Sequence, residues 1–341
     1  SPIPIVRSAV TWQIFPYSPM AAAIVEGAGT MNIGNFKTIE RLGGGVFGSV
    51  YKAVDEYLDR TVAIKELGPV VFPLGPDADI LVRETRLLAE MNHPYIATVY
   101  ASGFHQSQPY RGRAYIATEF LPDCLTGRMR SGRRLSVGEA VQIAGQVCDG
   151  LAFAHNRGVI HRDIKPKNIR ISEGGDVKIV DFGLAWQIEF SRREFARLSH
   201  VEDVNPFSVG AFGGTPHYAA PEQFEDDNVD AQADVYAVGI VLYQMLTGQL
   251  PFQSDSLMTL YDKHKSGVPV PVLPADLHVP TWLQSVVERS VEKDRQQRYQ
   301  SVGGMLADIE YGIEWELAGE DSDRLQSSPF PWRRRSPYVA P

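Results

Sequence analysis

The chain has 341 residues, of which 44% are hydrophobic and 22% are charged. This composition is ordinary for a globular protein and excludes the apolar depletion that marks intrinsic disorder. The formal net charge of -8 argues against a nucleic-acid binder, because phosphate backbones are held by an excess of Lys and Arg.

No stretch reaches the roughly 18 to 20 apolar residues that a membrane-spanning helix needs, so we expect no membrane segment in this chain. The two cysteines, Cys124 and Cys148, supply neither a disulfide framework nor a CxxC metal site. This favours a reducing compartment and a cytoplasmic location.

The first part of the chain is rich in predicted strands. Residues 1–30 contain four prolines, and we expect them to form an unstructured N-terminal extension. Residues 31–121 carry short runs of β-branched and aromatic residues separated by Gly, Asp or Pro. These runs predict strands at 36–43, 49–55, 60–67, 97–104 and 113–120. A helical pattern at 77–91 interrupts them.

The second part, residues 122–318, is predicted to be mainly helical. Ser136 and Glu139 form a capping box that opens a helix, which Gly158 closes. Two short strands follow, joined by a Gly174-Gly175 turn. Further helices are predicted at 234–248, 280–294 and 301–317. Residues 319–341 contain Pro, Ser and three consecutive arginines, which is typical of a linker or tail.

Two motifs in the strand-rich part are individually weak. Gly43 to Gly48 read GxGxxG between two predicted strands, a pattern that suits either phosphate binding or an ordinary Gly-rich hairpin. A strand follows it and not a helix, which disfavours a dinucleotide-binding fold. Lys65 ends an alternating strand, where a solvated lysine is common, but Glu84 in the predicted helix offers a carboxylate to hold it.

The strongest motif is the run His161-Arg162-Asp163-Ile164-Lys165-Pro166-Lys167-Asn168. Asp181-Phe182-Gly183 and Ala220-Pro221-Glu222 follow it. With these motifs in this order, the sequence resembles the eukaryotic-type (Hanks-type) serine/threonine protein kinase family over residues 36–317. The residues within the motifs are typical of bacterial members of the family. The resemblance implies an α+β bilobal fold, with a small β-rich N-lobe containing one helix and a larger α-helical C-lobe.

The resemblance also implies which residues act. It gives catalytic roles to the base or orienting carboxylate, the charges around it and a contact in the docking segment, which are Asp163, Lys165, Lys65, Glu84 and Thr215. It gives nucleotide contacts to Gly43, Gly45, Phe47, Gly48, Val50, Ala63, Lys65, Thr118, Glu119, Leu121 and Arg170. It gives the metal to Asn168 and Asp181.

Further positions have architectural roles by the same resemblance. Glu222 is expected to pair with Arg298, and Asp234 to brace the catalytic loop. A packing column is expected from Leu88, Val99, His161 and Phe182. Arg170 departs from the family, which usually has an aliphatic residue beneath the adenine; we expect its stem to pack and its head to reach solvent or an acid.

The implied function is transfer of the γ-phosphoryl group of ATP to Ser or Thr hydroxyls of protein substrates, with Mg²⁺, or alternatively Mn²⁺. Two alternatives remain open: a pseudokinase nucleotide-binding scaffold, and a small-molecule kinase, although the latter generally lacks the segment at Ala220-Pro221-Glu222. Arg162 implies control by activation-loop phosphorylation, with transient dimerisation for autophosphorylation in trans. Between Leu184 and Gly214 the hydroxyl-bearing residues are Ser191, Ser199 and Ser208.

Overall fold

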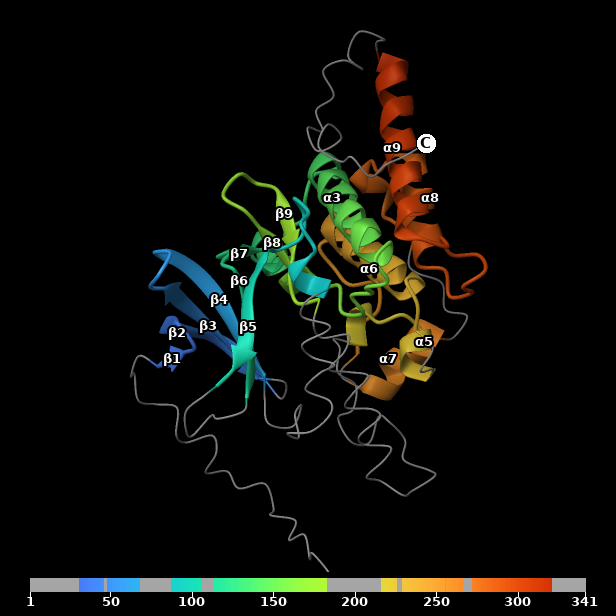
Figure 1. The fold of residues 1–341 in the computed structure, drawn as a ribbon. Helices are drawn as coiled ribbons and strands as arrows, with labels where there is room; N and C mark the ends of the chain where they lie inside the picture. Colours follow the sequence, from blue (N-terminus) through green and yellow to red (C-terminus); the bar gives the residue numbers. More distant parts are fainter. Residues whose placement is uncertain are drawn as a thin grey trace, which may run out of the picture.

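The computed structural model describes residues 31–45, 48–67, 87–105, 113–182, 216–225, 229–254, 256–265 and 272–320. A twisted sheet is formed by the first part of the chain and a helical body by the second, and the two meet at β6 to β9 (Figure 1). This arrangement confirms the α+β bilobal fold.

The N-lobe is built on a six-stranded antiparallel sheet with the order β1-β2-β3-β4-β6-β5. Its strands are β1 (Asn32–Ile33), β2 (Phe36–Gly45), β3 (Gly48–Asp55), β4 (Arg60–Leu67), β5 (Val99–Phe104) and β6 (Ala114–Glu119). All five predicted strands are confirmed, with end shifts of a few residues, and β1 is an addition.

Alternation along β4 shows why this sheet forms. Val62 and Ile64 are fully buried, whereas Ala63 and Lys65, which alternate with them, are half-buried. Successive strand residues point to opposite faces, so one face of the sheet packs into an apolar cluster and the other is left for polar contacts. That cluster consists of Ile33, Phe36, Ala53, Val62, Ile64 and Ala117.

After β6 the chain enters a short crossing segment and a second small sheet, ordered β7-β8-β9. The segment contains β7 (Asp123–Cys124), α2 (Leu125–Arg128) and the 3-10 turn η3 (Arg130–Gly132). The sheet is completed by β8 (Ile169–Ile171) and β9 (Val177–Ile179), the predicted hairpin, with Gly175 at φ +85° in its turn. The 3-10 turn η4 (Pro166–Asn168) comes directly before β8.

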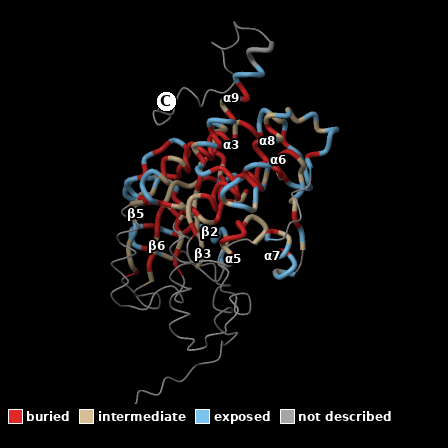
Figure 2. The backbone as a smooth tube through the Cα atoms, turned by 90° about the vertical axis from the view of Figure 1, so that its right-hand side faces the viewer, coloured by how far each residue is buried: buried red, intermediate tan, exposed pale blue. Residues whose placement is uncertain are grey.

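The C-lobe core is formed by long helices: α3 (Val137–His155), α6 (Gln232–Thr247), α8 (Thr281–Ser290) and α9 (Val302–Glu320). Shorter elements surround them: η6 (Pro216–Tyr218), α5 (Glu222–Glu225), α7 (Leu257–Lys265) and η7 (Ala275–Leu277). Buried positions concentrate where α3, α6 and α8 pack together (Figure 2). This layer gives the site beside it a rigid support.

Helix termini follow the sequence signals in part. The capping box is present, because Ser136 Oγ accepts from the Glu139 N–H and the Glu139 carboxylate accepts from the Ser136 N–H. Helix α8 stops at Ser290, four residues before the predicted end. Helix α9 continues to Glu320, so residues 319–320 extend the helix and do not belong to the predicted tail. Of the predicted helix 77–91, residues 87–89 are helical, and 77–86 lie outside the described residues.

Within the described residues, no helix is both long enough and apolar enough to cross a membrane. Cys124 and Cys148 are both unpaired thiols.

Candidate active site

The loop 161–168, which is expected to be the catalytic loop, is held in place by Asp234 on α6. The Asp234 carboxylate accepts hydrogen bonds of 2.8 Å from each of the backbone N–H groups of His161 and Arg162. His155 Nε2 lies 2.8 Å from the same carboxylate. Burial alone would raise the pKa of Asp234, but the bond and charge of His155, with His161, hold that pKa below its ordinary value. The predicted bracing role of Asp234 is therefore matched by its geometry.

Asp163 lies at the centre of a compact polar group. Its Oδ2 atom is 2.7 Å from Lys165 Nζ and accepts a 3.1 Å hydrogen bond from Asn168 Nδ2. The same Nδ2 atom donates to the Asp163 backbone carbonyl at 2.9 Å. The loop thus brings together a buried carboxylate, an ammonium group and an amide, three of the predicted site residues.

Asp181 is placed beside this group by β9. The N–H of Val180, its neighbour, donates to the Asn168 carbonyl at 2.9 Å, and His161 Nε2 lies 2.8 Å from the Val180 carbonyl. Asp181 itself has φ +68°, in the left-handed region that non-glycine residues seldom occupy. The backbone at this point is therefore fixed by its hydrogen bonds, which bring Asn168 and Asp181, the two predicted metal ligands, to one place.

Lys65 reaches this place from the other lobe. Its Nζ atom lies 3.3 Å from Asp181 Oδ1 and donates a hydrogen bond to it. Desolvation alone would raise the pKa of Asp181, but the charge and hydrogen bond of Lys65, with the charges of His161 and Lys165, hold that pKa below its ordinary value. Asp181 therefore carries a negative charge at neutral pH.

Four of the predicted nucleotide contacts, Val50, Ala63, Lys65 and Thr118, share one face of the N-lobe sheet. Val50 lies opposite Lys65, and Ala63 lies opposite Thr118. Residues directly opposite in a ladder, and residues two apart in a strand, point to the same side. Because Lys65 on this side contacts Asp181, the row formed by Val50, Ala63, Lys65 and Thr118 faces the C-lobe. Gly43 lies opposite Val50, and Gly45 opposite Gly48, at the end of the same hairpin.

The predicted hinge residues are Glu119, which ends β6, and Leu121, which follows it two residues later. The Glu119 carboxylate pairs with Lys178 of β9 at 2.9 Å and accepts a 3.4 Å hydrogen bond from the Thr98 N–H. Leu121 is buried. The pairing of Glu119 with Lys178 was not predicted, because no motif connects a hinge carboxylate with a lysine so distant in the sequence.

Arg170 lies on β8 between the buried residues Ile169 and Ile171, and is itself half-buried. It is directly opposite Lys178 of β9, so the two side chains leave the sheet on the same side. Lys178 extends to the hinge, which places Arg170 beneath the same segment. Within the described residues the guanidinium has no hydrogen bond or ion pair, so of the two expectations, solvent or an acid, no acidic partner is found there.

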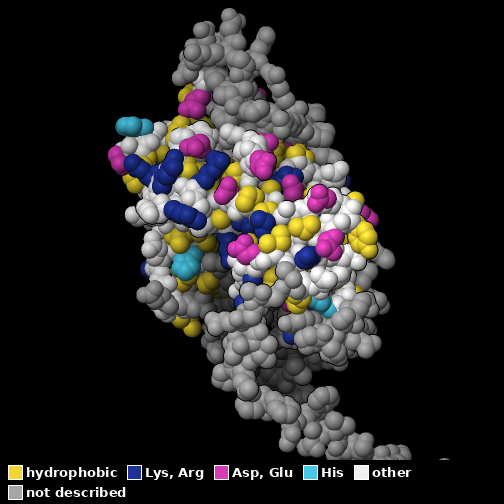
Figure 3. All heavy atoms as spheres, turned by 90° about the vertical axis from the view of Figure 1, so that its left-hand side faces the viewer, with side chains coloured by type: hydrophobic (Ala, Val, Ile, Leu, Met, Phe, Trp, Pro, Cys, Tyr) yellow, Lys and Arg dark blue, Asp and Glu magenta, His cyan; other side chains and the backbone are white. Residues whose placement is uncertain are grey.

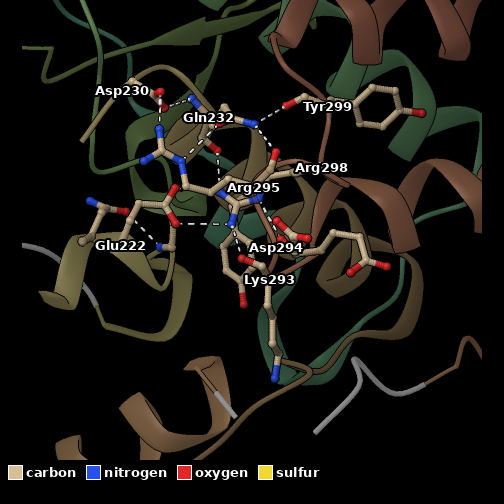
Figure 4. Close-up of polar contacts among 12 residues, drawn as sticks. Glu222, Asp230, Gln232, Lys293, Asp294, Arg295, Arg298 and Tyr299 are labelled. Atoms are coloured by element: carbon tan, nitrogen blue, oxygen red, sulfur yellow. Dashed lines mark hydrogen bonds and ion pairs between the residues drawn. The ribbon is translucent and has the colours of Figure 1, made fainter. Parts of the chain in front are cut away.

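The predicted ion pair between Glu222 and Arg298 is formed, and Figure 4 shows it within a larger polar network. Arg298 is fully buried and donates to both Glu222 carboxylate oxygens, at 2.7 and 3.2 Å. Next to Glu222, Gln223 Nε2 donates a 2.8 Å hydrogen bond to the Arg162 carbonyl. The segment that begins α5 is therefore tied both to the C-lobe core and to the catalytic loop.

The expected packing column is consistent with the described contacts. The rings of His161 and Phe182 lie 4.7 Å apart with an interplanar angle of 61°. Leu88 and Phe182 are buried in one apolar cluster, against which Val99 packs.

Some predicted residues lie outside the described residues: Phe47, Glu84, Thr215 and the serines Ser191, Ser199 and Ser208. Their expected roles stay predictions.

Comparison with known proteins gives concordant results. The family model described as "Protein kinase domain" matches residues 36–306. A "Probable serine/threonine-protein kinase PknB" of Lactococcus lactis is 31% identical over 314 residues, which cover 89% of this chain and 47% of the relative. The "Serine/threonine-protein kinase PknB" of Mycobacterium tuberculosis is 34% identical over 275 residues, 79% of this chain and 41% of the relative. The chain thus spans less than half the length of these relatives.

Proposed function

This chain belongs to the protein kinase family, and from that premise we propose that it is an active serine/threonine protein kinase. It transfers the γ-phosphoryl group of ATP to Ser or Thr hydroxyls of proteins. The observation that carries the proposal is the meeting of Lys65, from the N-lobe sheet, with Asp181, beside the group formed by Asp163, Lys165 and Asn168.

The chemistry of phosphoryl transfer fits this arrangement, because the reaction depends on positioned charge more than on covalent participation by the protein. Asp163 orients the substrate hydroxyl and accepts its proton. Lys165, 2.7 Å from Asp163, offsets negative charge on the transferring group. Lys65 contacts the α and β phosphates, and Gly43, Gly45 and Gly48 let backbone N–H groups approach them.

Asn168 and Asp181 are proposed to hold Mg²⁺, for which Mn²⁺ is an alternative. Asp181 offers an ionised carboxylate. The Nδ2 group of Asn168 donates hydrogen bonds to Asp163, which leaves the side-chain oxygen of Asn168 to act as a ligand. Hard oxygen ligands in small number suit an ion that completes its shell with water and phosphate oxygens. Such an ion neutralises phosphate charge when bound.

The base of ATP is proposed to lie on the row formed by Val50, Ala63 and Thr118, with the backbones of Glu119 and Leu121 at its edge. By resemblance to the family, Arg170 is proposed to lie on the opposite side of the base. Phe47, Glu84 and Thr215 complete the proposed set by resemblance to the family.

A cytoplasmic location for this domain is proposed from chemistry alone. ATP is abundant there, and the two thiols are unpaired, as expected in a reducing compartment.

Transfer of radiolabel from γ-labelled ATP to a generic protein substrate tests the proposal. We expect incorporation that requires Mg²⁺ or Mn²⁺ and that falls to background in the Asp163→Asn protein. Binding of ATP without any transfer, under every metal condition, would instead identify a nucleotide-binding scaffold.

A further inference from the structure

A cluster of cations lies on the C-lobe directly after the hinge. Four arginines occur within seven residues, all with exposed side chains: Arg128, Arg130, Arg133 and Arg134. Arg134 has an acidic partner, Asp276, at 3.8 Å. Within the described residues, no ion pair or hydrogen bond engages the side chains of the other three.

This cluster adjoins the catalytic loop. Arg128 ends α2, and α2 packs against η4, the turn that contains Lys167. Lys167 is exposed, has no ion pair within the described part of the chain, and immediately precedes Asn168, which contacts Asp163. We refer to Arg128, Arg130, Arg133 and Lys167 as the basic rim.

Neighbouring acids offset the charge of the basic rim only in part. The pKa of Glu139 is lowered mainly by the hydrogen bonds that its carboxylate makes with Ser136, and to a smaller extent by the nearby charges of Arg128 and Arg133. Asp276 pairs with Arg134, which is not part of the rim. The remaining acid of this segment is Asp123, at its start. Figure 3 shows several Lys and Arg side chains gathered in one area of the face that it presents, with Asp and Glu side chains beside them. In a chain of net charge -8, a locally positive surface is typical of a site that binds anionic groups.

We propose that the basic rim binds acidic residues of protein substrates, close to the hydroxyl that Asp163 receives. The inference rests on the proposed kinase function and names the substrate class of that same site. Guanidinium groups form paired, charge-assisted hydrogen bonds with carboxylates, and a row of them selects sequences by charge as well as by contact. The position of Lys167 beside Asn168 favours a peptide over a larger polyanion, because it brings the rim next to the loop that contains Asp163.

Two peptides test this directly. Both contain one Ser acceptor; one has Asp and Glu on both sides of it, and the other has Asn and Gln at those positions. We expect kcat/KM to be about tenfold higher for the acidic peptide at low salt, mainly through KM, since several exposed ion pairs contribute together. Raising the salt concentration to about 0.5 M should remove most of the difference.

Charge-removal variants assign the effect to the rim. The triple variant Arg128→Gln, Arg130→Gln, Arg133→Gln and the single variant Lys167→Gln should each lower the preference for the acidic peptide, the triple variant to within about twofold of none. Lys37→Gln is the matched control, because Lys37 is an exposed cation on β2 of the N-lobe. It should keep the wild-type preference.

Binding separates failure of this inference from failure of the proposed function. The Asp163→Asn protein should bind the labelled acidic peptide more tightly than the neutral one, whether or not the wild-type protein transfers phosphate. Equal binding of both peptides, or an unchanged preference in the triple variant, would overturn the role of the rim. Absence of transfer to either peptide, with selective binding retained, would overturn the kinase activity and leave the rim as a docking surface for acidic segments.

Discussion

Lys178 Nζ lies 2.9 Å from the Glu119 carboxylate, and this contact joins the end of the N-lobe sheet to β9 of the C-lobe. Both side chains are partly shielded, with exposed fractions of 19% and 24%. An ion pair in this position restricts the segment that the proposed nucleotide site uses as its edge. Loss of this ion pair should therefore weaken ATP binding as well as lower the free energy of unfolding.

We expect Lys178→Gln to weaken ATP binding about twofold to fivefold and to lower the unfolding free energy by about 0.5 to 1 kcal/mol, as for a partly exposed pair. Titration calorimetry with ATP and Mg²⁺ measures the first quantity, and urea denaturation measures the second. Lys37→Gln serves again as the control for loss of a surface charge. If the variant matches wild type in both measurements, the pair has no part in holding the hinge.

Removing the central charges should abolish turnover while preserving the fold. We expect Asp163→Asn and Lys65→Met each to lower kcat by about a thousandfold or more, because positioned charge supplies most of the stabilisation in phosphoryl transfer. The melting temperature should change by no more than about 3 °C. Steady-state assays and thermal denaturation check both statements. Retained transfer in both variants is incompatible with the assigned roles.

Arg170 supplies a third test. Since its guanidinium has no ion pair within the described residues, Arg170→Leu breaks none there and provides the aliphatic floor usual in the family. We expect ATP affinity to be equal or up to about threefold tighter, because an approaching base no longer desolvates a charge. The comparison with Arg170→Lys separates charge from shape. A loss of tenfold or more in the Leu variant would show that the guanidinium contacts the nucleotide.

Much of the fold could be predicted from local pattern. Alternation in β4 distinguishes Val62 and Ile64, which are buried, from Lys65, which faces the other lobe. The motif at 161–168 predicts that Asp163, Lys165 and Asn168 act together, and their side chains do contact one another. Both features could be predicted because the signal lies within a few residues of the chain.

Features that depend on distant partners could not be predicted in this way. Nothing near Lys178 or Glu119 in the sequence shows that they meet. Helix α8 stops at Ser290, four residues before the predicted end, where the carbonyls of Glu292 and Lys293 accept hydrogen bonds from the buried Arg298. Tertiary contacts there override the local preference for helix.

Buried histidines should make stability depend on pH. His264 is fully buried among aromatic rings, and its Nδ1 atom lies 2.8 Å from the Tyr236 hydroxyl. Burial, with the nearby charges of Lys293 and His217, lowers the pKa of His264 to about 3. Below about pH 6.5 the side chain of His264 is therefore protonated in the unfolded chain but stays neutral in the folded chain. The free energy of unfolding is unaffected above about pH 6.5 and falls below it, by up to about 1.4 kcal/mol per pH unit.

Urea denaturation between pH 7 and pH 4.5 measures this dependence. His264→Gln should be less stable at pH 7 but should show a shallower decline with falling pH than wild type. His278→Gln is the matched control, because His278 is exposed and should leave the slope unchanged. Identical slopes for wild type and His264→Gln would mean that His264 is not a source of acid sensitivity.

The buried pair between Glu222 and Arg298 should show an asymmetry between its two partners. Arg298 donates to the Glu222 carboxylate and also to the backbone carbonyls of Gln232, Glu292 and Lys293. Arg298→Met therefore leaves a buried carboxylate without its cation and three carbonyls without a donor. Glu222→Gln keeps an acceptor for the guanidinium but removes the opposing charge. Breaking a buried ion pair from one side lowers the free energy of unfolding by about 3 to 5 kcal/mol. We therefore expect Arg298→Met to reach or exceed this range and Glu222→Gln to fall at its lower end.

The double variant tests whether the two residues act as a pair. It should be more stable than the sum of the two single losses predicts, because no unpaired charge remains, although the three carbonyls still lack their donor. Urea denaturation of all four proteins gives the coupling energy. Additive losses in this cycle would show that the two residues stabilise the C-lobe independently and that the pair itself contributes nothing.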